Sequence, residues 1–231
     1  RYMFGGKAKV PLTIRTMFGA GFRAAAQHSQ TLYAIFTHMP GIKVVVPSTP
    51  ADAKGLLLAS IADDDPVIFF EDKTLYSKSG EVPEGEYTIP LGKADIKRAG
   101  SDLTIVAIGK MVHTALEAAD QLAQKGIEAE VVDPRPLSPL DEETILDSVA
   151  KTNRLIVIDE ANPRCSVARD IAAMVADKGF DTLDAPIKTI TAPHTPVPFS
   201  PALEDLYLPN ASRVLEVVSE LIGDESLKAI S

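Results

Sequence analysis

Several features are scarce in this sequence of 231 residues, and each scarcity excludes a class of protein. The only cysteine is Cys165, so no disulfide can form within the chain, which fits a reducing compartment. No apolar run reaches the roughly 20 residues that cross a bilayer. Residues 1–6 lack the charged and apolar regions of a signal peptide. We therefore expect a cytoplasmic globular protein that does not enter a membrane.

Positive charge is scarce in one part of the chain only. The net charge is −9; residues 1–91 carry 9 Lys or Arg and 9 Asp or Glu, whereas residues 92–231 carry 14 and 23. A nucleic-acid partner is not expected, because its phosphates require a basic surface. The acidic second part could bind a basic protein partner or could serve solubility alone.

Strand and helix patterns alternate in the first part of the chain. A helix is expected over residues 51–62, with Leu56, Leu57 and Ile61 on its buried face. Glycines, prolines and charges without a sustained period predict an extended linker over residues 76–90. Short β-branched or aromatic runs predict strands at residues 10–16, 42–46 and 67–70.

The second part of the chain repeats this alternation with stronger apolar runs. Such alternation is typical of a mostly parallel sheet covered by helices on both faces. We therefore expect an α/β protein with two domains, over residues 1–91 and 92–231. The strands of the second domain are expected at residues 103–108, 129–133 and 155–159, and its helices at residues 112–125, 141–150 and 166–178.

A glycine-rich turn follows the first expected strand. Residues 19–24, Gly-Ala-Gly-Phe-Arg-Ala, match the dinucleotide pattern G-x-G-x-x-A. That pattern also requires an acidic residue after the next strand, but the next strand ends in Val46-Pro47-Ser48, which is neutral. A nicotinamide-dependent oxidoreductase is therefore one alternative, and a tight turn without a ligand is the other.

A histidine lies between amide and hydroxyl side chains just after this turn. In Gln27-His28-Ser29-Gln30, such neighbours could fix one tautomer and leave the other ring nitrogen free to move a proton near neutral pH. A structural role for His28 is the alternative. The cases for His38, His113 and His194 are weaker, and no zinc site is expected, since no two histidines have the spacing of zinc ligands.

A group of three aspartates and a single glutamate are further candidates. Asp63, Asp64 and Asp65 come at a helix end, where unpaired carbonyls already make the potential negative. They form either a solvated turn or a site for a hard cation. Glu71 comes at the end of an apolar strand, where ligands of parallel sheets often bind.

Six segments together resemble the beta subunits of thiamine-diphosphate-dependent 2-oxo-acid and acetoin dehydrogenases, within the transketolase-like superfamily. The resemblance runs nearly end to end and in order. Two further stretches, residues 159–166 and 191–201, favour the acetoin branch over the pyruvate branch. The six segments are residues 2–6 (Tyr-Met-Phe-Gly-Gly), 27–30 (Gln-His-Ser-Gln), 40–47, 52–56, 65–68 and 137–141.

The resemblance implies a fold and partners. Residues 1–91 would be a truncated transketolase-like pyrimidine-binding domain with its linker, and residues 92–231 a transketolase C-terminal-like domain. The N-terminal part of the first domain is expected to be missing, which would leave an exposed sheet edge or apolar patch. The expected partners are an alpha subunit in a heterotetramer, a second beta subunit, and a lipoyl acyltransferase.

The resemblance also implies cofactors and site residues. Such enzymes cleave acetoin, or decarboxylate a 2-oxo acid such as pyruvate, and pass the acyl unit to lipoamide. Thiamine diphosphate and magnesium would be bound largely by the alpha subunit and by residues upstream of Arg1, so the chain is expected to be inactive alone. His28 would be catalytic, at the mouth of the active site. A structural potassium ion would be bound by Leu12, Ser60, Ile61, Asp63 and Asp65.

Two alternatives to this function remain at the level of the sequence. One is the nicotinamide-dependent oxidoreductase that would use the turn at residues 19–24. The other is a non-catalytic assembly module whose acidic second domain binds a basic partner.

Overall fold

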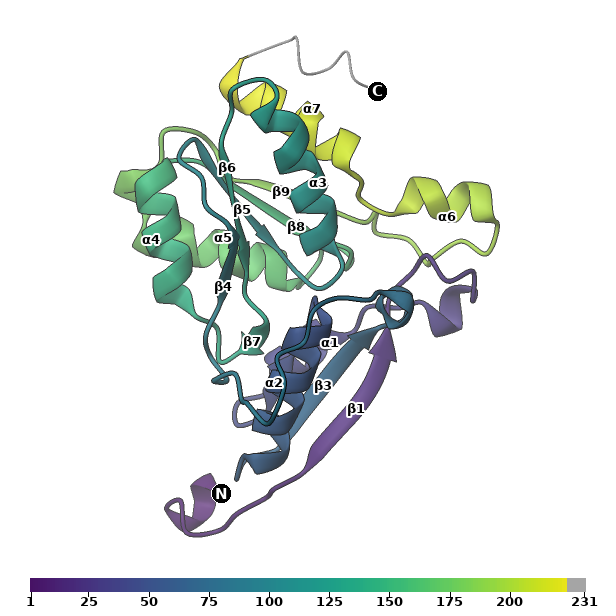
Figure 1. Ribbon diagram of the computed structural model, residues 1–231, viewed down its shortest axis with the longest axis vertical. Helices are drawn as coiled ribbons and strands as arrows, with labels where there is room; N and C mark the ends of the chain where they lie inside the picture. Colours follow the sequence, from purple (N-terminus) through teal and green to yellow (C-terminus); the bar gives the residue numbers. More distant parts are fainter. Residues whose placement is uncertain (224–231) are drawn as a thin grey trace.

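Two sheets, one above the other in Figure 1, organise the chain, and a computed structural model describes residues 1–223. The first sheet has the strand order β1-β3-β2-β7. Strands β1, β3 and β2 run parallel, and β7 pairs antiparallel with β2. The strands are β1 (Thr13–Phe18), β2 (Lys43–Val45), β3 (Val67–Asp72) and β7 (Pro136–Ser138).

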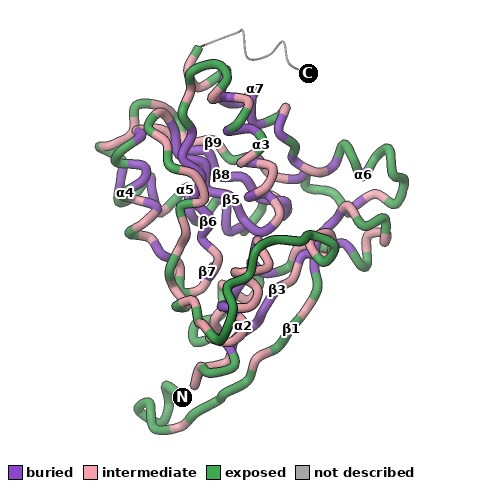
Figure 2. Tube along the Cα trace, viewed as in Figure 1, coloured by how far each residue is buried: buried purple, intermediate pink, exposed green. Residues whose placement is uncertain are grey.

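Strand β1 forms one edge of this sheet, because it pairs with β3 alone. Ile14 and Met17 of β1 expose 45% and 61% of their surface. Most of β1 is exposed or half-buried, as Figure 2 shows. Strand β1 therefore presents an unpaired edge with exposed apolar side chains. The helical elements of this region are α1 (Tyr33–Thr37), α2 (Pro50–Ala62) and the short 3₁₀ helices η1 (Tyr2–Phe4), η2 (Ala26–His28) and η3 (Lys73–Ser77).

The second sheet has the order β4-β6-β5-β8-β9. Only β4 runs antiparallel to its neighbour, so the sheet is mostly parallel, as predicted. Every residue of β5, β6 and β8 is buried. The strands are β4 (Asp95–Arg98), β5 (Leu103–Ala107), β6 (Ala129–Asp133), β8 (Leu155–Asp159) and β9 (Lys188–Thr191).

Helices cover both faces of the second sheet. Side chains of α3 and α7 pack with Ile105 and Ile156 on one face, whereas those of α4 and α5 pack with Val106 and Val157 on the other. The core on the α4 and α5 face also contains Phe18 of β1, so apolar packing continues into the first sheet. The helices are α3 (Met111–Ala123), α4 (Glu142–Thr152), α5 (Val167–Lys178), η4 (Phe180–Thr182), α6 (Pro201–Tyr207) and α7 (Ala211–Ile222).

One predicted core position is wrong. Ile61 exposes 61% of its surface, whereas Leu56 is fully buried and Leu57 is partly buried. The polar Ser60 is buried in place of Ile61, and its hydroxyl donates to the carbonyl of Leu56 at 2.7 Å. Satisfying the hydroxyl within the helix removes most of the cost of burying it.

No helix among residues 1–223 combines the length and the apolar character that a membrane crossing requires.

Candidate active site at the junction of the two sheets

Strand ends from both sheets meet at one junction, which holds the candidate site. Strands β1 and β3 of the first sheet end at Phe18 and Asp72, and β8 of the second sheet ends just before Glu160. The side chain of Lys110, at the start of α3, lies between them. Its ammonium is 2.5 Å from Glu160 and 3.7 Å from Asp72. Carboxyl ends of parallel strands are a usual place for ligand sites in α/β proteins.

The carboxylates at this junction are buried. Glu160 and Asp72 expose 3% and 2% of their surface. Burial raises the pKa of Glu160 to about 7, although the ammonium of Lys110 acts in the opposite direction. Next to it, the buried hydroxyl of Tyr33 donates to Asp159. Burial also raises the pKa of Asp159, against the effect of that hydrogen bond.

The glycine turn contacts a carboxylate of the chain itself. The amide of Gly21 donates to Oε1 of Glu204 in α6 at 2.6 Å, and the guanidinium of Arg23 lies 3.0 Å from Oε2. The turn leads into a 3₁₀ helix, η2, instead of the α-helix whose N-terminus receives a dinucleotide phosphate. Because Glu204 occupies the anion position, the turn at residues 19–24 does not have the geometry of a nicotinamide site.

His28 is the last residue of η2, and its side chain is exposed, not packed among aliphatic side chains. Its backbone carbonyl accepts a hydrogen bond from the ammonium of Lys73, which follows β3. Of its neighbours, Ser29 is buried while Gln27 and Gln30 are exposed. The side chain of His28 is therefore open to solvent, while its backbone is bonded to Lys73 at the end of β3.

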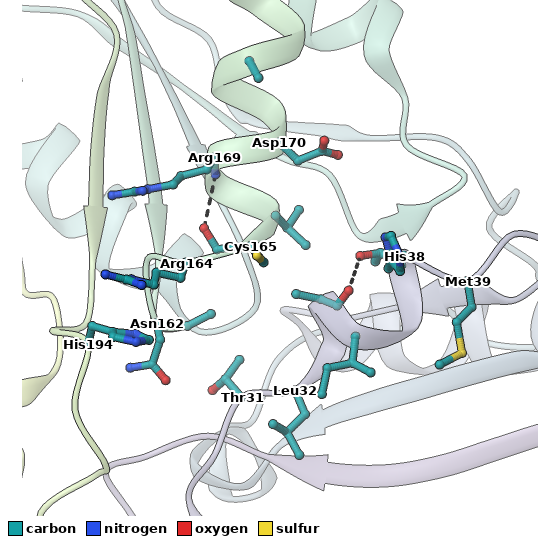
Figure 3. A pocket seen from close by; sticks show the side chains of 17 residues that line it. Thr31, Leu32, His38, Met39, Asn162, Arg164, Cys165, Arg169, Asp170 and His194 are labelled. Carbon is teal, nitrogen blue, oxygen red and sulfur yellow. Dashed lines mark hydrogen bonds between the residues drawn. The ribbon is translucent and has the colours of Figure 1, made fainter.

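The other three histidines lie elsewhere. Nε2 of His113, in α3, is 2.8 Å from the carbonyl of Ser48, and burial lowers the pKa of this ring. His38 and His194 line a pocket of about 950 Å³ between α1 and α5. In Figure 3, His194, Arg164 and Arg169 line one side, whereas His38 lies on the opposite side with Leu32 and Met39. Cys165, the free cysteine, is exposed in the same pocket.

The five residues of the predicted cation site come close together around the end of α2. The carbonyl of Ser60 accepts from the hydroxyl of Thr13 at 2.9 Å, and the carbonyl of Leu12 accepts from the amide of Val67 at 2.9 Å. Ile61 contributes only backbone, since its side chain faces solvent.

The carboxylates of this group already have cationic neighbours. The ammonium of Lys43 is 2.6 Å from Asp63 and 3.4 Å from Asp65, and Arg1 is 3.1 Å from Asp65. The contact with Lys43 lowers the pKa of Asp63, although burial acts against it. Among residues 1–223, no three His, Cys, Asp or Glu side chains form a group that could hold a metal ion.

Glu71, the remaining carboxylate singled out from the sequence, contacts one residue of β1 and one of η3. Its oxygens accept from Arg15 at 2.6 Å and from the hydroxyl of Tyr76 at 3.1 Å. Lys110, Asp72, Glu160 and Glu204 were not predicted as site residues. Two of them had a usable signal in the sequence, because Asp72 and Glu160 come at or just after the end of an apolar strand.

Comparisons with known proteins agree with this architecture. The family described as "Transketolase, pyrimidine binding domain" matches residues 1–78, and "Transketolase, C-terminal domain" matches residues 92–214. The fold is similar to that of a solved split-gene transketolase in an inactive beta4 tetramer, with a TM-score of 0.77 over 93% of this chain and 67% of that one. At 24% identity, this likeness concerns the fold alone.

Several curated relatives share much higher sequence identity with this chain than the split-gene transketolase does. The chain is 71% identical to the Bacillus subtilis (strain 168) "Acetoin:2,6-dichlorophenolindophenol oxidoreductase subunit beta", over 98% of this chain and 66% of that protein. It is 63% identical to the protein of the same name from Cupriavidus necator, over 93% of this chain and 63% of that protein. It is 49% identical to the "Pyruvate dehydrogenase E1 component subunit beta" of Bacillus subtilis, over 96% of this chain and 68% of that protein.

The chain spans about two thirds of the length of these curated relatives. Both transketolase domain families are matched in order, and the identity extends across almost the whole chain. The chain therefore belongs to the transketolase-like family of dehydrogenase beta subunits.

Proposed function

We propose that this chain is part of the beta subunit of a thiamine-diphosphate-dependent dehydrogenase that cleaves acetoin and passes the two-carbon unit to lipoamide. The observation that carries this proposal is the 71% identity to an acetoin oxidoreductase subunit over 98% of the chain. A pyruvate or branched-chain 2-oxo acid is the alternative substrate, because the identity to the pyruvate dehydrogenase subunit is still 49%.

The proposed organisation has two domains. Residues 1–91 form the pyrimidine-binding domain with its linker, and residues 92–231 form the C-terminal domain. The alpha subunit, a second beta subunit and the lipoyl acyltransferase are the proposed partners. The acidic excess of residues 92–231 supports contact of that domain with a basic surface of the acyltransferase. Cytoplasmic localisation is part of the same proposal.

His28 is the proposed catalytic residue of this chain. Thiamine diphosphate supplies an electron sink when it is bound in the assembled enzyme. As the family resemblance implies, we assign magnesium and the diphosphate largely to the alpha subunit. The side chain of His28 is exposed, and its backbone is bonded to Lys73 at the end of β3. From this position the ring can donate or accept a proton during transfer to lipoamide.

The test is reconstitution of this chain, within its full-length subunit, with the alpha subunit and the acyltransferase. Acetoin, pyruvate and 2-oxoisovalerate are compared in two assays, reduction of 2,6-dichlorophenolindophenol and transfer to lipoamide. Acetoin is expected to give the highest kcat/KM. No turnover with any of the three substrates would refute the proposed activity.

The variant His28→Ala is expected to lower turnover in one assay much more than in the other. It should lower turnover with lipoamide by about two to four orders of magnitude, because a positioned acid or base contributes that much. Reduction of the dye, which needs no lipoyl group, should fall much less. Equal turnover of the variant and the parent enzyme with lipoamide would remove His28 from the mechanism.

We also propose that Leu12, Ser60, Ile61, Asp63 and Asp65 bind potassium. Carbonyl oxygens have two lone pairs, so the hydrogen bonds from Thr13 and Val67 leave one free on each carbonyl. Lys43 competes for the carboxylates, so Lys43→Met should increase the effect of the ion. The measurement is the Tm in potassium chloride against choline chloride. A Tm that does not depend on potassium in either protein would refute the site.

A further inference from the structure

The segment that carries His28 has almost no regular structure of its own. We call residues 19–31, between β1 and α1, the His28 loop; its only element is the short helix η2. Arg23 and Ala25 adopt left-handed backbone angles, with φ values of 59° and 61°. Such angles cost roughly 1 kcal/mol or more at residues with a side chain, so the surroundings must hold the loop in this shape.

Contacts from the second sheet hold both ends of this loop. At the start of the loop, the ammonium of Lys110 donates to the carbonyl of Ala20 at 2.5 Å. At the end of the loop, the hydroxyl of Thr31 donates to Oε1 of Glu160 at 2.7 Å. Oε2 of the same glutamate is 2.5 Å from the ammonium of Lys110. One carboxylate therefore reaches the end of the loop directly and its start through Lys110.

The packing around Glu160 shows that the loop is built against it. A Cβ atom added at Gly19 would lie 2.9 Å from Oε1 of Glu160 and 2.9 Å from Oδ2 of Asp72. The backbone therefore approaches both carboxylates more closely than any residue with a side chain would allow. A buried charge is costly unless it is paired, and Lys110 provides that pairing.

Further contacts fix the middle of the loop. Glu204, fully buried in α6, accepts from the amide of Gly21 and pairs with Arg23. The ammonium of Lys73 donates to the carbonyl of His28 itself. Glu204 and Lys73 hold the middle of the loop, whereas Glu160 joins its two ends.

We propose that Glu160 is a positioning residue that fixes the His28 loop, and thereby the imidazole of His28, from the C-terminal domain. This inference rests on the proposed function of His28 and deepens it. One oxygen of the carboxylate contacts the ammonium of Lys110, and the other accepts from the hydroxyl of Thr31. Glutamine in its place keeps an acceptor for Thr31 but presents no charge to Lys110. Asp72 remains as a counter-ion for Lys110, so the fold should tolerate the change.

The chain offers a matched control for Glu160→Gln. Glu130 in β6 is also a buried glutamate, with 1% of its surface exposed. It accepts from a hydroxyl, that of Ser148 at 2.6 Å, and pairs with a lysine, Lys151. Its partners lie in α4 and, through the amide of Gly100, in the loop between β4 and β5, and none belongs to the His28 loop. Glu130→Gln therefore removes the same kind of ion pair without touching residues 19–31.

The first measurement is lipoamide-linked turnover in the reconstituted complex. Glu160→Gln should lower kcat about 10- to 100-fold with little change in KM, because a misplaced reacting group costs that much. Glu130→Gln should leave kcat unchanged. In the His28→Ala background, Glu160→Gln should have no further effect. Equal kcat for the two glutamine variants, or effects of Glu160→Gln and His28→Ala that add in full, would overturn the proposal.

The second measurement needs no cofactor or partner. Hydrogen exchange in the full-length subunit should become faster for amides 19–31 in Glu160→Gln, but not in Glu130→Gln. If His28→Ala has no effect on turnover, the role of His28 fails, and exchange alone decides whether Glu160 fixes the loop. Unchanged exchange of amides 19–31 in Glu160→Gln would refute the positioning role whatever the kinetics show.

Discussion

The two sheets differ in how completely they are covered. In the second sheet, α3 and α7 lie on one face and α4 and α5 on the other, and every residue of β5, β6 and β8 is buried (Figure 1). The first sheet has an open edge at β1, with exposed apolar side chains. Its strand ends also lead into the segments that carry His28 and Lys73.

This difference predicts that the second sheet contributes more to the free energy of unfolding than the first. A sheet buried on both faces gains most from apolar burial, whereas an open edge with exposed apolar groups gains less. The charged groups that join the two regions, Lys110, Asp72 and Glu160, lie between the sheets. The second sheet is thus the more completely buried body, and Lys110 and Glu160 tie the His28 loop to it.

The largest effect is expected when isoleucine is replaced by alanine in each sheet. Ile156→Ala in β8 removes a fully buried side chain and should lower the free energy of unfolding by about 2–5 kcal/mol. Ile14→Ala in β1 should cost roughly 1 kcal/mol or less, because this side chain is already 45% exposed. Urea unfolding measures both. Equal losses would show that the two sheets contribute alike to stability.

Much of the fold could be predicted from the sequence, because the central strands carry strong local patterns. The apolar runs at β6 and β8 predicted both strands with their observed bounds. The edge strands β4 and β9 were missed, since alternating polar residues such as Lys97 and Lys188 hide them. Helices α6 and α7 follow a proline-rich loop and were missed as well.

The site was harder to predict, because its parts are brought together only by the fold. His28 and the acidic end of α2 could be found from short motifs and from the family resemblance. Glu160 and Lys110 lie 50 residues apart in the sequence and meet Ala20 and Thr31 only when the two sheets pack. Glu204 lies 183 residues from Gly21, so no local pattern could reveal that contact.

A pH-dependent effect is expected at a second contact between the two parts of the chain, where Asp133 meets Ser48. Asp133, at the end of β6, accepts from the hydroxyl of Ser48 at 2.5 Å, and burial raises its pKa to about 7. The pKa of this carboxyl in the unfolded chain is about 4. Between these values the folded state binds more protons than the unfolded state, so the contribution of Asp133 to stability falls as pH rises.

Asp133→Asn should remove that dependence. From pH 4 to pH 7, the free energy of unfolding of the parent chain should fall relative to the variant by about 2–4 kcal/mol. The asparagine can still bond Ser48, since a hydroxyl donates or accepts. Urea unfolding across this pH range measures the difference, with Asp147→Asn on the exposed face of α4 as the control. A difference that stays constant with pH would contradict the prediction.

A smaller effect is expected where the backbone approaches the junction. Gly19→Ala places a methyl group 2.9 Å from two buried carboxylates at a φ of 100°, and should cost about 1–3 kcal/mol. Gly85→Ala in the linker also has a positive φ, 73°, but nothing lies within 4 Å of the added atom. Gly85→Ala therefore measures the cost of backbone strain alone, and the additional loss in Gly19→Ala measures the steric clash. Equal losses in thermal unfolding would show that the carboxylates move aside.

The smallest effect compares one helix start from each region. The hydroxyl of Thr49 accepts from the amide of Asp52 at 3.1 Å and donates to its carboxylate at 2.6 Å, whereas that of Ser166 accepts from the amide of Arg169 at 3.3 Å. Removing a cap costs about 1 kcal/mol. Thr49→Ala should cost more than Ser166→Ala, because Asp52 also pairs with Lys97 of β4 and with Arg135, which follows β6. If Ser166→Ala costs more in urea unfolding, the start of α2 does not support the contact between the sheets, and α5 of the second sheet depends more on its own cap.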